Sequence, residues 1–383
     1  MRVIHVTSRL DPRLGGVVTA VTGLALAQRA IGMDVSVLST FKAGDDPQMV
    51  KHLHDRGVRT VMIGPAITPL VWHRDIAGVL RQQSADILHI HAIWEEVHHR
   101  AARVCQSQRR PYLIAPHGML DPWCLRQSGT KKRLYLAWRL RRNLNRAAAL
   151  HFTAETERKL TEPLRLTSRA IVEPNGLDMA EFAALPPRGL LRQRFPQLGD
   201  RRLVLFLSRI HPKKGLDLLI PAFARCGVKD AVLVLAGPAE AGYQVELQAM
   251  IHAEGLQDRV VFTGMLHGRQ RLEALVDAEV FVLPSYQENF GIVVAEALAC
   301  AVPVIISDQV NICDEVRAAG VGVVTPTQVA PLAETIGQWM NDEPRRRAAA
   351  ALARPFVENR YDWLQIARRW AEHYRRLAED DAP

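Results

Sequence analysis

The amino-acid sequence predicts an α/β protein with two doubly wound domains, each a parallel sheet covered by helices on both faces. Short apolar runs of strand length alternate with segments of helical periodicity almost from end to end. The chain has 383 residues, which is long for one domain and ordinary for two. Prolines gather near its middle, where they interrupt regular structure: Pro174, Pro186, Pro187 and Pro196.

The expected strands follow this alternation in order. In the first half they are residues 3–7, 35–40, 59–63, 87–91, 112–115 and 149–152. In the second half they are residues 203–207, 232–236, 260–262, 280–283, 304–306 and 321–324. An amphipathic helix is expected at about residues 363–379. We therefore expect domains at residues 1–167 and 168–362.

Composition excludes several classes of protein. Hydrophobic residues make up 48% of the chain, enough for two cores, whereas aromatics at 6% are too few for a base-stacking platform. The five cysteines are scattered without a Cys-x-x-Cys pair, so neither a zinc site nor a disulfide framework is indicated. The chain opens on a strand-like run and has no apolar stretch of about 18 residues. We expect a cytoplasmic protein, soluble or peripheral on a membrane.

Two carboxylates lie eight residues apart around a predicted strand–turn–helix junction. Glu288 follows the strand at 280–283, and Glu296 lies in the helix that begins after Phe290 and Gly291. Ligands of open α/β sheets bind at this edge, and the free amides at a helix start accept anions. Carboxylates suit hydroxyl groups, so the pattern favours a polyol joined to a phosphate. Taken alone, it is also typical of two surface glutamates.

Two cations follow the strand at 203–207. Arg209 and Lys214 lie five residues apart across a bend that ends at Gly215. Arginine offers a planar fork for phosphate oxygens and lysine a compact charge. The alternative is a pair of exposed cations. The G-x-x-x-x-G-K-[ST] pattern of a P-loop is absent.

Two further turns lie at strand ends in the first half. Gly15 and Gly16 follow the first strand and allow close approach of a ligand, but they do not form a dinucleotide-binding G-x-G-x-x-G motif. His117 and Gly118 follow the strand at 112–115, where the imidazole can donate a hydrogen bond to a hydroxyl or a carbonyl. Each turn, taken alone, is more typical of ordinary structure than of a site.

The net charge of +9 is concentrated in one stretch, which begins at Pro122 and ends at Arg146. From Arg126 onward it contains eight Lys or Arg and no Asp or Glu, interleaved with aromatic residues and leucines. Such segments bind anionic membrane surfaces, with about 1 kcal/mol from each cation near the surface. A solvated helix with a buried stripe is the alternative. Nucleic acid is not expected, because no recognition motif accompanies the charge.

In order and spacing, these motifs resemble retaining nucleotide-sugar glycosyltransferases of glycosyltransferase family 4. The resemblance runs over most of the chain: Gly15-Gly16, Pro116-His117-Gly118, Asn175-Gly176-Leu177-Asp178, Arg209 through Gly215, and Glu288 to Glu296. It implies the GT-B fold, in which two Rossmann-like domains face each other across a cleft. The first domain is then the acceptor side, the second binds the donor, and the final helix packs back on the first.

The resemblance also implies roles for the motif residues. Arg209 and Lys214 would hold the donor diphosphate, Glu288 would contact the transferred sugar, and Glu296 would bind the ribose hydroxyls. The remaining contacts would come from the main chain of Asn289, Phe290 and Gly291, from the turn Gly15-Gly16, and from His117 near the reacting face of the sugar. One common family form has glycine at the position of Asn289.

The expected activity is transfer of a hexose, with retention, from a UDP- or GDP-sugar to a glycan acceptor. The chain contains no Asp-x-Asp, so no metal or other cofactor is expected. It also lacks an obvious nucleophile, which favours same-face transfer. The resemblance suggests a lipid-linked (polyprenyl-linked) acceptor in bacterial exopolysaccharide or lipopolysaccharide synthesis. Alternatives are a nucleotide-sugar epimerase or phosphorylase of the same fold, and a catalytically silent scaffold of a polysaccharide-assembly complex.

Overall fold

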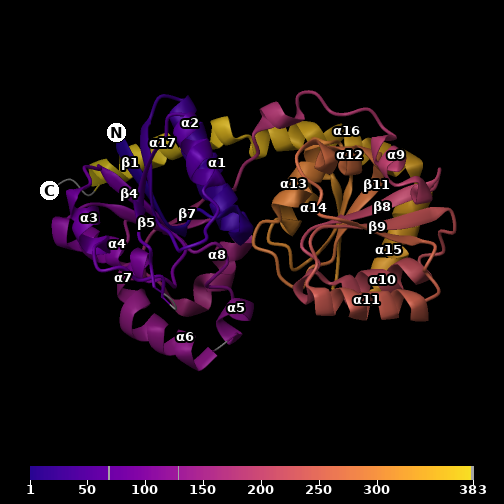
Figure 1. Cartoon of the computed structure of the whole chain (residues 1–383), viewed down its shortest axis with the longest axis horizontal. Helices are drawn as coiled ribbons and strands as arrows, with labels where there is room; N and C mark the ends of the chain where they lie inside the picture. Colours follow the sequence, from indigo (N-terminus) through magenta and orange to yellow (C-terminus); the bar gives the residue numbers. More distant parts are fainter. Residues whose placement is uncertain (68–69, 128, 381–383) are drawn as a thin grey trace. The chain divides into compact units, whose positions relative to one another are not determined.

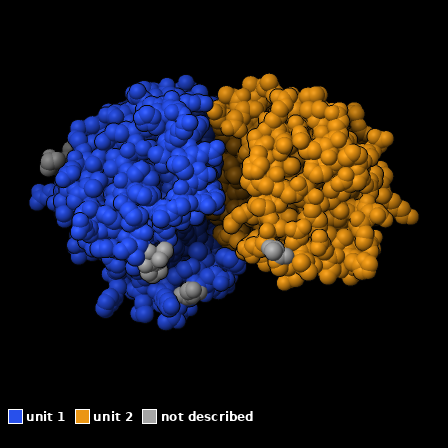
Figure 2. All heavy atoms as spheres, in the orientation of Figure 1, with its two compact units in different colours: residues 1–176, 362–383 blue, residues 177–361 orange. Residues whose placement is uncertain are grey.

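The computed structural model describes residues 1–67, 70–127 and 129–380. The chain forms two compact units, coloured separately in Figure 2. Unit 1 contains Met1–Gly176 and Asp362–Pro383, and unit 2 contains Leu177–Tyr361. Each unit is a parallel sheet with helices packed on it (Figure 1), so the predicted α/β class is confirmed. No helix among the described residues is long and apolar enough to cross a bilayer.

Unit 1 contains a seven-stranded sheet in the order β3-β2-β1-β4-β5-β6-β7, with every neighbouring pair parallel. Its strands are β1 (Arg2–Arg9), β2 (Asp34–Thr40), β3 (Arg59–Ile63), β4 (Ile87–His91), β5 (Tyr112–Ala115), β6 (Ala149–Phe152) and β7 (Ala170–Val172). Strand β7 was not predicted, because its three residues are too few to show a period. It extends unit 1 to Gly176, so the predicted boundary after residue 167 falls nine residues too early.

Helices cover both faces of this sheet. They are α1 (Gly16–Ala30), α2 (Gln48–Asp55), α3 (Ile76–Gln82), α4 (Glu96–Gln108), α5 (Pro122–Arg126), α6 (Gly129–Tyr135), α7 (Arg141–Asn145), α8 (Glu155–Thr161) and α17 (Trp363–Asp380). A π-helical turn, Leu136–Leu140, joins α6 to α7. Short 3₁₀ turns occupy Pro12–Leu14 and Glu162–Leu164.

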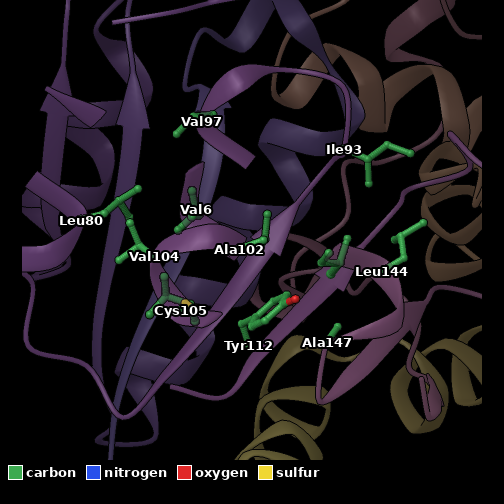
Figure 3. Packing of buried hydrophobic residues seen from close by; sticks show 14 of the residues in the cluster. Val6, Leu80, Ile93, Val97, Ala102, Val104, Cys105, Tyr112, Leu144 and Ala147 are labelled. Carbon is green, nitrogen blue, oxygen red and sulfur yellow. The ribbon is translucent and has the colours of Figure 1, made fainter. Parts of the chain in front are cut away.

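Two apolar layers hold unit 1 together. One packs α3, α4 and the segment from the π-helical turn to α7 against the sheet, and Figure 3 shows Val6, Val97 and Tyr112 within it. The other is made by α17, whose apolar stripe packs on α1 and on the opposite face of the sheet. A side chain at Gly23 would lie 2.3 Å from the Trp363 indole, so only glycine lets α1 and α17 approach this closely.

Unit 2 contains a six-stranded parallel sheet in the order β10-β9-β8-β11-β12-β13. The strands are β8 (Arg202–Leu207), β9 (Ala231–Ala236), β10 (Val260–Gly264), β11 (Ala278–Leu283), β12 (Val304–Ser307) and β13 (Gly322–Thr325). The helices are α9 (Leu190–Arg194), α10 (Leu216–Arg225), α11 (Ala241–Ala253), α12 (Arg269–Asp277), α13 (Ile292–Ala299), α14 (Cys313–Ala319), α15 (Val329–Asn341) and α16 (Glu343–Arg360). The 3₁₀ turns are Met179–Phe182, Pro196–Leu198 and Pro212–Lys214.

Strand order reverses once in each sheet, and this determines where a ligand can bind. In unit 1 the connections leave β1 and β4 in opposite directions, and in unit 2 they do so at β8 and β11. Ligands of open α/β sheets bind beyond the carboxyl ends of two such strands. The predicted motif residues after β1, β8 and β11 therefore lie at the two switch points.

Candidate functional site

The loops after β8 and β11 touch each other at Gly215. This residue has φ +72°, and a Cβ built on it would lie 2.1 Å from the Pro284 carbonyl oxygen. Beside this contact, the Tyr286 N–H donates to the Lys213 carbonyl at 2.9 Å. Glycine is required both by the left-handed backbone and by the close approach. The contact places the cationic loop against the loop that carries Glu288.

Lys214 and Glu288 form an ion pair at this junction, with Nζ bonded to Oε2. Lys214 is buried, and the Glu288 side chain is 18% exposed. The Glu288 backbone is fixed on both sides: its N–H donates to the Gln309 carbonyl and its carbonyl accepts from the Asn311 N–H, each at 3.0 Å. The structure thus brings together the predicted diphosphate-binding lysine and the predicted sugar-binding carboxylate.

Arg209 lies two residues beyond the end of β8 and is exposed. Among the described residues, none accepts a hydrogen bond from its guanidinium or pairs with it. The next residue, Ile210, is buried and bridges to Ala239, which fixes the backbone at this point. Arg209 therefore offers an uncommitted fork of donors at the same edge of the sheet as Lys214.

Helix α13 begins at the same edge without a side-chain cap. Its N-cap is Gly291, with φ +72°, and its first turn contains no acidic residue. Phe290 is buried and meets Tyr361 edge to face at 5.2 Å, so its side chain belongs to the core. Asn289 accepts a hydrogen bond from the Asn311 amide at 3.3 Å. The helix start is left with amides that suit a phosphate or a sugar oxygen.

Glu296 is buried on α13, and its two oxygens differ. Arg271 of α12 donates to Oε1 at 2.6 Å and pairs through its other nitrogen with Glu181 at 3.0 Å. Oε2 is buried without a hydrogen-bond partner among the described residues. Burial raises the pKa of Glu296 to about 7, because the lost hydration outweighs the attraction of Arg271. The carboxylate therefore has one free oxygen ready for hydroxyl donors.

The structure places the other predicted site residues in unit 1. Gly15 has φ +79° and ψ −136°, a conformation that is strained for residues with a side chain, and a Cβ on Gly15 or Gly16 would meet nothing within 4 Å. Gly16 opens α1, which has neither a side-chain cap nor an acidic first turn. The turn thus leaves an open, donor-rich helix start after β1.

His117 follows β5 in a left-handed conformation, with φ +51°. The turn is held by the buried Glu157 of α8, which accepts from the Gly118 N–H at 2.5 Å and from the Thr153 N–H at 2.6 Å. The His117 ring is half-buried, and its Nε2 bonds to His91 Nδ1 at 3.0 Å. Burial lowers the pKa of His117 to about 3, so the ring is neutral at physiological pH. A strained backbone held by surrounding bonds is a common feature of functional sites.

The basic stretch spans α5, α6, the π-helical turn and α7. Leu136, Leu140 and Leu144 are spaced four apart and face the core. Leu134 and Trp138 share the outer face and are 64% and 89% exposed. The stretch therefore has a buried leucine stripe together with an exposed apolar pair.

Cations surround this exposed pair. Lys131, Arg133 and Arg142 are exposed, and the neighbouring positive charges of Arg146 and Arg103 lower the pKa of Arg142. The segment therefore has the buried stripe expected of a solvated helix, and binding of its outer face to a membrane stays a prediction.

Several residues of these sites escaped sequence reasoning. Arg271 lies far from any motif and Glu181 three residues beyond Asp178, and only the fold brings them together with Glu296. Glu157 is one of two glutamates in the first turn of α8, with no signal of its own. A pattern was visible for the histidines: His89 and His91 alternate on one strand, and His5 pairs in register with His89 on the next.

Comparisons with known proteins agree with this architecture. Residues 15–176 match the family described as glycosyl transferase 4-like domain, and residues 188–355 match glycosyl transferases group 1. A D-inositol 3-phosphate glycosyltransferase of Kineococcus radiotolerans is 29% identical over 258 residues, which is 61% of this chain and 59% of that relative. The chain thus spans less than two thirds of the length of this relative.

Two further similarities extend over nearly the whole chain. A GDP-mannose:cellobiosyl-diphosphopolyprenol alpha-mannosyltransferase of Xanthomonas campestris is 25% identical over 98% of this chain and 96% of its own. The crystal structure of HepE from Anabaena in complex with UDP and glucose superposes with a TM-score of 0.78 at 22% identity, covering 97% of this chain and 99% of that one. The fold is therefore that of the GT-B glycosyltransferases. The two family matches together span most of the chain, which belongs to the glycosyltransferases, with a glycosyl transferase 4-like first half and a group 1 second half.

Proposed function

We propose that the protein transfers a hexose, with retention of configuration, from a UDP- or GDP-sugar to a glycan acceptor. The observation that carries the proposal is the set of groups after β8 and β11: the Lys214–Glu288 pair and the free oxygen of Glu296. A cation suits a diphosphate, and two carboxylates suit a sugar and a ribose. The relatives whose printed names state a donor or an activity support the same class of reaction.

In this proposal the ligand-free ion pair is a resting arrangement. The Lys214 ammonium turns from Glu288 to the diphosphate when a donor binds, and Glu288 becomes free to accept from sugar hydroxyls. Arg209 adds a second cation from the same loop. As the glycosidic bond breaks, negative charge grows on the leaving diphosphate, and preorganised cations stabilise this charge.

The proposed reaction proceeds on one face of the sugar and needs no metal. The acceptor hydroxyl attacks from the side that the diphosphate leaves, and a phosphate oxygen takes its proton. Arg209, Lys214 and the start of α13 supply the positive potential that a divalent cation provides in other transferases. Same-face attack leaves the anomeric configuration of the product equal to that of the donor.

The proposed acceptor is a lipid-linked glycan at an anionic membrane surface, as in exopolysaccharide or lipopolysaccharide assembly. Leu134 and Trp138 form an exposed apolar pair among exposed cations, which suits the interface of an anionic bilayer. The Xanthomonas campestris relative, whose printed name includes a diphosphopolyprenol-linked substrate, supports this kind of acceptor.

The test is a transfer assay with UDP-glucose and GDP-mannose, in EDTA, with polyprenyl-diphosphate-linked oligosaccharides as acceptors. Acceptor-dependent release of nucleotide, with a product of the donor's anomeric configuration, is the expected result. Turnover that requires a divalent cation, or a product of inverted configuration, would contradict the corresponding part of the proposal. Binding of donor without turnover on any acceptor would instead indicate a silent partner.

A further inference from the structure

A chain of hydrogen-bonded side chains runs through the interior of unit 1 and ends at His117. Its members come from β1, β4, β6, the turn after β5, the residue after β7 and the helices α1 and α17. In order they are the Glu173 carbonyl, His151, His89, Tyr374, Gln28, His5, His91 and His117. Each side chain except that of His117 is at most 3% exposed. No motif of the candidate site accounts for this network.

The direction of the first bonds is set by the main chain. His151 Nε2 lies 2.8 Å from the Glu173 carbonyl oxygen, which can only accept, so His151 donates through Nε2. Its Nδ1 must then accept from His89 Nε2, at 3.1 Å. His89 Nδ1 accepts in turn from the Tyr374 hydroxyl, at 2.7 Å. The single proton of Tyr374 is used here, so its oxygen accepts from the Gln28 amide, at 3.2 Å.

The same reasoning sets the direction of the remaining hydrogen bonds in the network. Because Gln28 donates to Tyr374, its Oε1 faces His5 and accepts from His5 Nε2, at 2.7 Å. His5 Nδ1 must accept from His91 Nε2, at 2.9 Å. His91 Nδ1 accepts from His117 Nε2, at 3.0 Å. His117 therefore carries its proton on Nε2, and its Nδ1 keeps a lone pair.

The assignment requires the rings of His151, His89, His5 and His91 to be neutral, since a second proton on any of them would set two donors against each other. His117 is neutral because burial lowers its pKa to about 3. Burial favours this state: it lowers the pKa of His5 and of His151 to about 4 and the pKa of His89 and of His91 well below 6.5. Two independent features, geometry and burial, thus agree.

A metal centre is the competing interpretation of the same cluster. One ligand atom from each of His5, His89 and His91 lies within 4.8 Å of the others, and all three residues are buried. However, all six ring nitrogens of these residues already take part in the bonds described above. A metal would have to displace at least two of these bonds, so the hydrogen-bonded chain is favoured.

We infer that this buried chain is a positioning network that holds His117 in its Nε2–H form and presents Nδ1 as a hydrogen-bond acceptor. The ligand group that His117 takes must then be a donor, a hydroxyl rather than a phosphate or a carboxylate. The identity of this hydroxyl as that of a sugar rests on the proposed function. The state of the ring does not, because it follows from the ligand-free protein.

The experiment is ¹⁵N NMR of the histidine side chains in the full-length, ligand-free protein at pH 7, with His117 assigned by comparison with His117→Gln. We expect His117 to have a protonated Nε2 and an unprotonated Nδ1. A His117 protonated on Nδ1, or on both nitrogens, would overturn the inference. So would stoichiometric binding of added Zn²⁺ that abolishes the signals of His5, His89 and His91.

A variant tests the network itself. Tyr374→Phe removes the acceptor that orients Gln28, so the amide becomes free to turn and His117 should become a mixture of both forms. Tyr112→Phe is the matched control, because it also removes a buried hydroxyl, one that donates to the Asn143 carbonyl at 2.8 Å, from the same unit. If His117 is unchanged in Tyr374→Phe, the network does not set its state. Should this variant fail to fold, the wild-type spectrum still decides.

Discussion

At the scale of single residues, the site combines charged groups, some of which already have a hydrogen-bond or ion-pair partner before any ligand binds. Lys214 is neutralised by Glu288, whereas Glu296 retains a buried oxygen without a partner among the described residues. An unpaired buried acceptor costs about 1–3 kcal/mol in a folded protein. Such a cost is offset when a ligand supplies the missing donors, so these two carboxylates are where binding should have its largest effects.

Lys214→Ala should lower kcat by about 10²–10³-fold, because it removes one preorganised charge beside the leaving diphosphate. Lys229→Ala is the matched control, since Lys229 is exposed just before β9, at the amino-terminal edge of the same sheet. Steady-state transfer assays on both variants provide the comparison. Near wild-type turnover for Lys214→Ala would remove this residue from the proposed chemistry.

Donor binding should strengthen as pH rises from about 6 to 8. Ribose hydroxyls would donate to the ionised form of Glu296, whose pKa is raised to about 7, so below that pH the carboxyl must lose a proton before it binds. The affinity should fall up to tenfold for each pH unit below 7. Calorimetric titration of UDP-glucose and GDP-mannose checks this, and Glu296→Gln should bind weakly without the pH dependence. The same slope in that variant would exclude Glu296 as its source.

The same pKa predicts a change in stability with pH. The folded pKa of Glu296 lies above its unfolded value, so folding favours the protonated form and the contribution of this group is fully present below about pH 4.5. That contribution is lost as pH rises through about 7. Urea unfolding of wild type and Glu296→Gln between pH 5 and 8 should show the wild type losing stability relative to the variant. A parallel pH course for both would contradict the raised pKa.

At the scale of elements, the two loops of unit 2 depend on one glycine. Gly215 ends the 3₁₀ turn Pro212–Lys214 and lets the loop after β8 touch Pro284. Proline fixes the entry to that turn and the left-handed glycine its exit. The start of α10, the Lys214–Glu288 ion pair and the contact with Pro284 are therefore parts of one local structure.

Gly215→Ala should destabilise unit 2 by about 2–4 kcal/mol, since it adds backbone strain of about 1 kcal/mol to a clash with the Pro284 carbonyl. Gly227→Ala is the matched control: Gly227 has φ +76°, but a Cβ there would meet nothing within 4 Å. This control should lose only about 1 kcal/mol. Denaturant unfolding measures both, and equal losses would show that the contact with Pro284 is unimportant.

Sequence patterns predicted most elements because strands in parallel sheets are continuous apolar runs. The runs at β8, β9 and β11 are buried in the structure. The two exceptions are Arg202, the first residue of β8, and Glu279, the second residue of β11. Strand β7 was missed because it is short, and the π-helical turn Leu136–Leu140 because its leucine spacing is also that of an α-helix. In the site, motif residues were predictable from turns after strands. Arg271 and Tyr374 were not, since only tertiary packing brings them to their partners.

At the scale of the whole molecule, each unit places its loops at the switch point of its own sheet. Unit 2 carries the groups suited to a nucleotide-sugar, whereas unit 1 carries the glycine turn, His117 and the basic stretch. Unit 1 is built from two separate stretches of the chain, because α17 follows unit 2 in sequence and packs on unit 1. Unit 2 is one continuous stretch. In the proposed reaction, activity needs both units, while donor binding is expected to depend mainly on unit 2.

Anionic vesicles should retain the protein through the basic stretch of unit 1. Replacing Lys131 and Arg133 with Gln should weaken binding by about 2 kcal/mol, which is roughly 30-fold, and Trp138→Ala should weaken it further. Leu352→Ala is the control, because Leu352 is a similarly exposed apolar residue on α16. Vesicle flotation at low salt gives the comparison. Equal recovery on neutral and anionic vesicles would contradict the membrane role.

The most direct test of the central claim is donor binding in the presence of EDTA, measured by thermal unfolding. A UDP- or GDP-sugar at 100 times its dissociation constant should stabilise the wild type by about 2.7 kcal/mol, a rise of several degrees in Tm. The gain should be much smaller in Lys214→Ala and in Glu296→Gln, and unchanged in Lys229→Ala. If neither nucleotide-sugar raises Tm without a metal, or if both site variants respond like the wild type, the loops after β8 and β11 do not form the donor site.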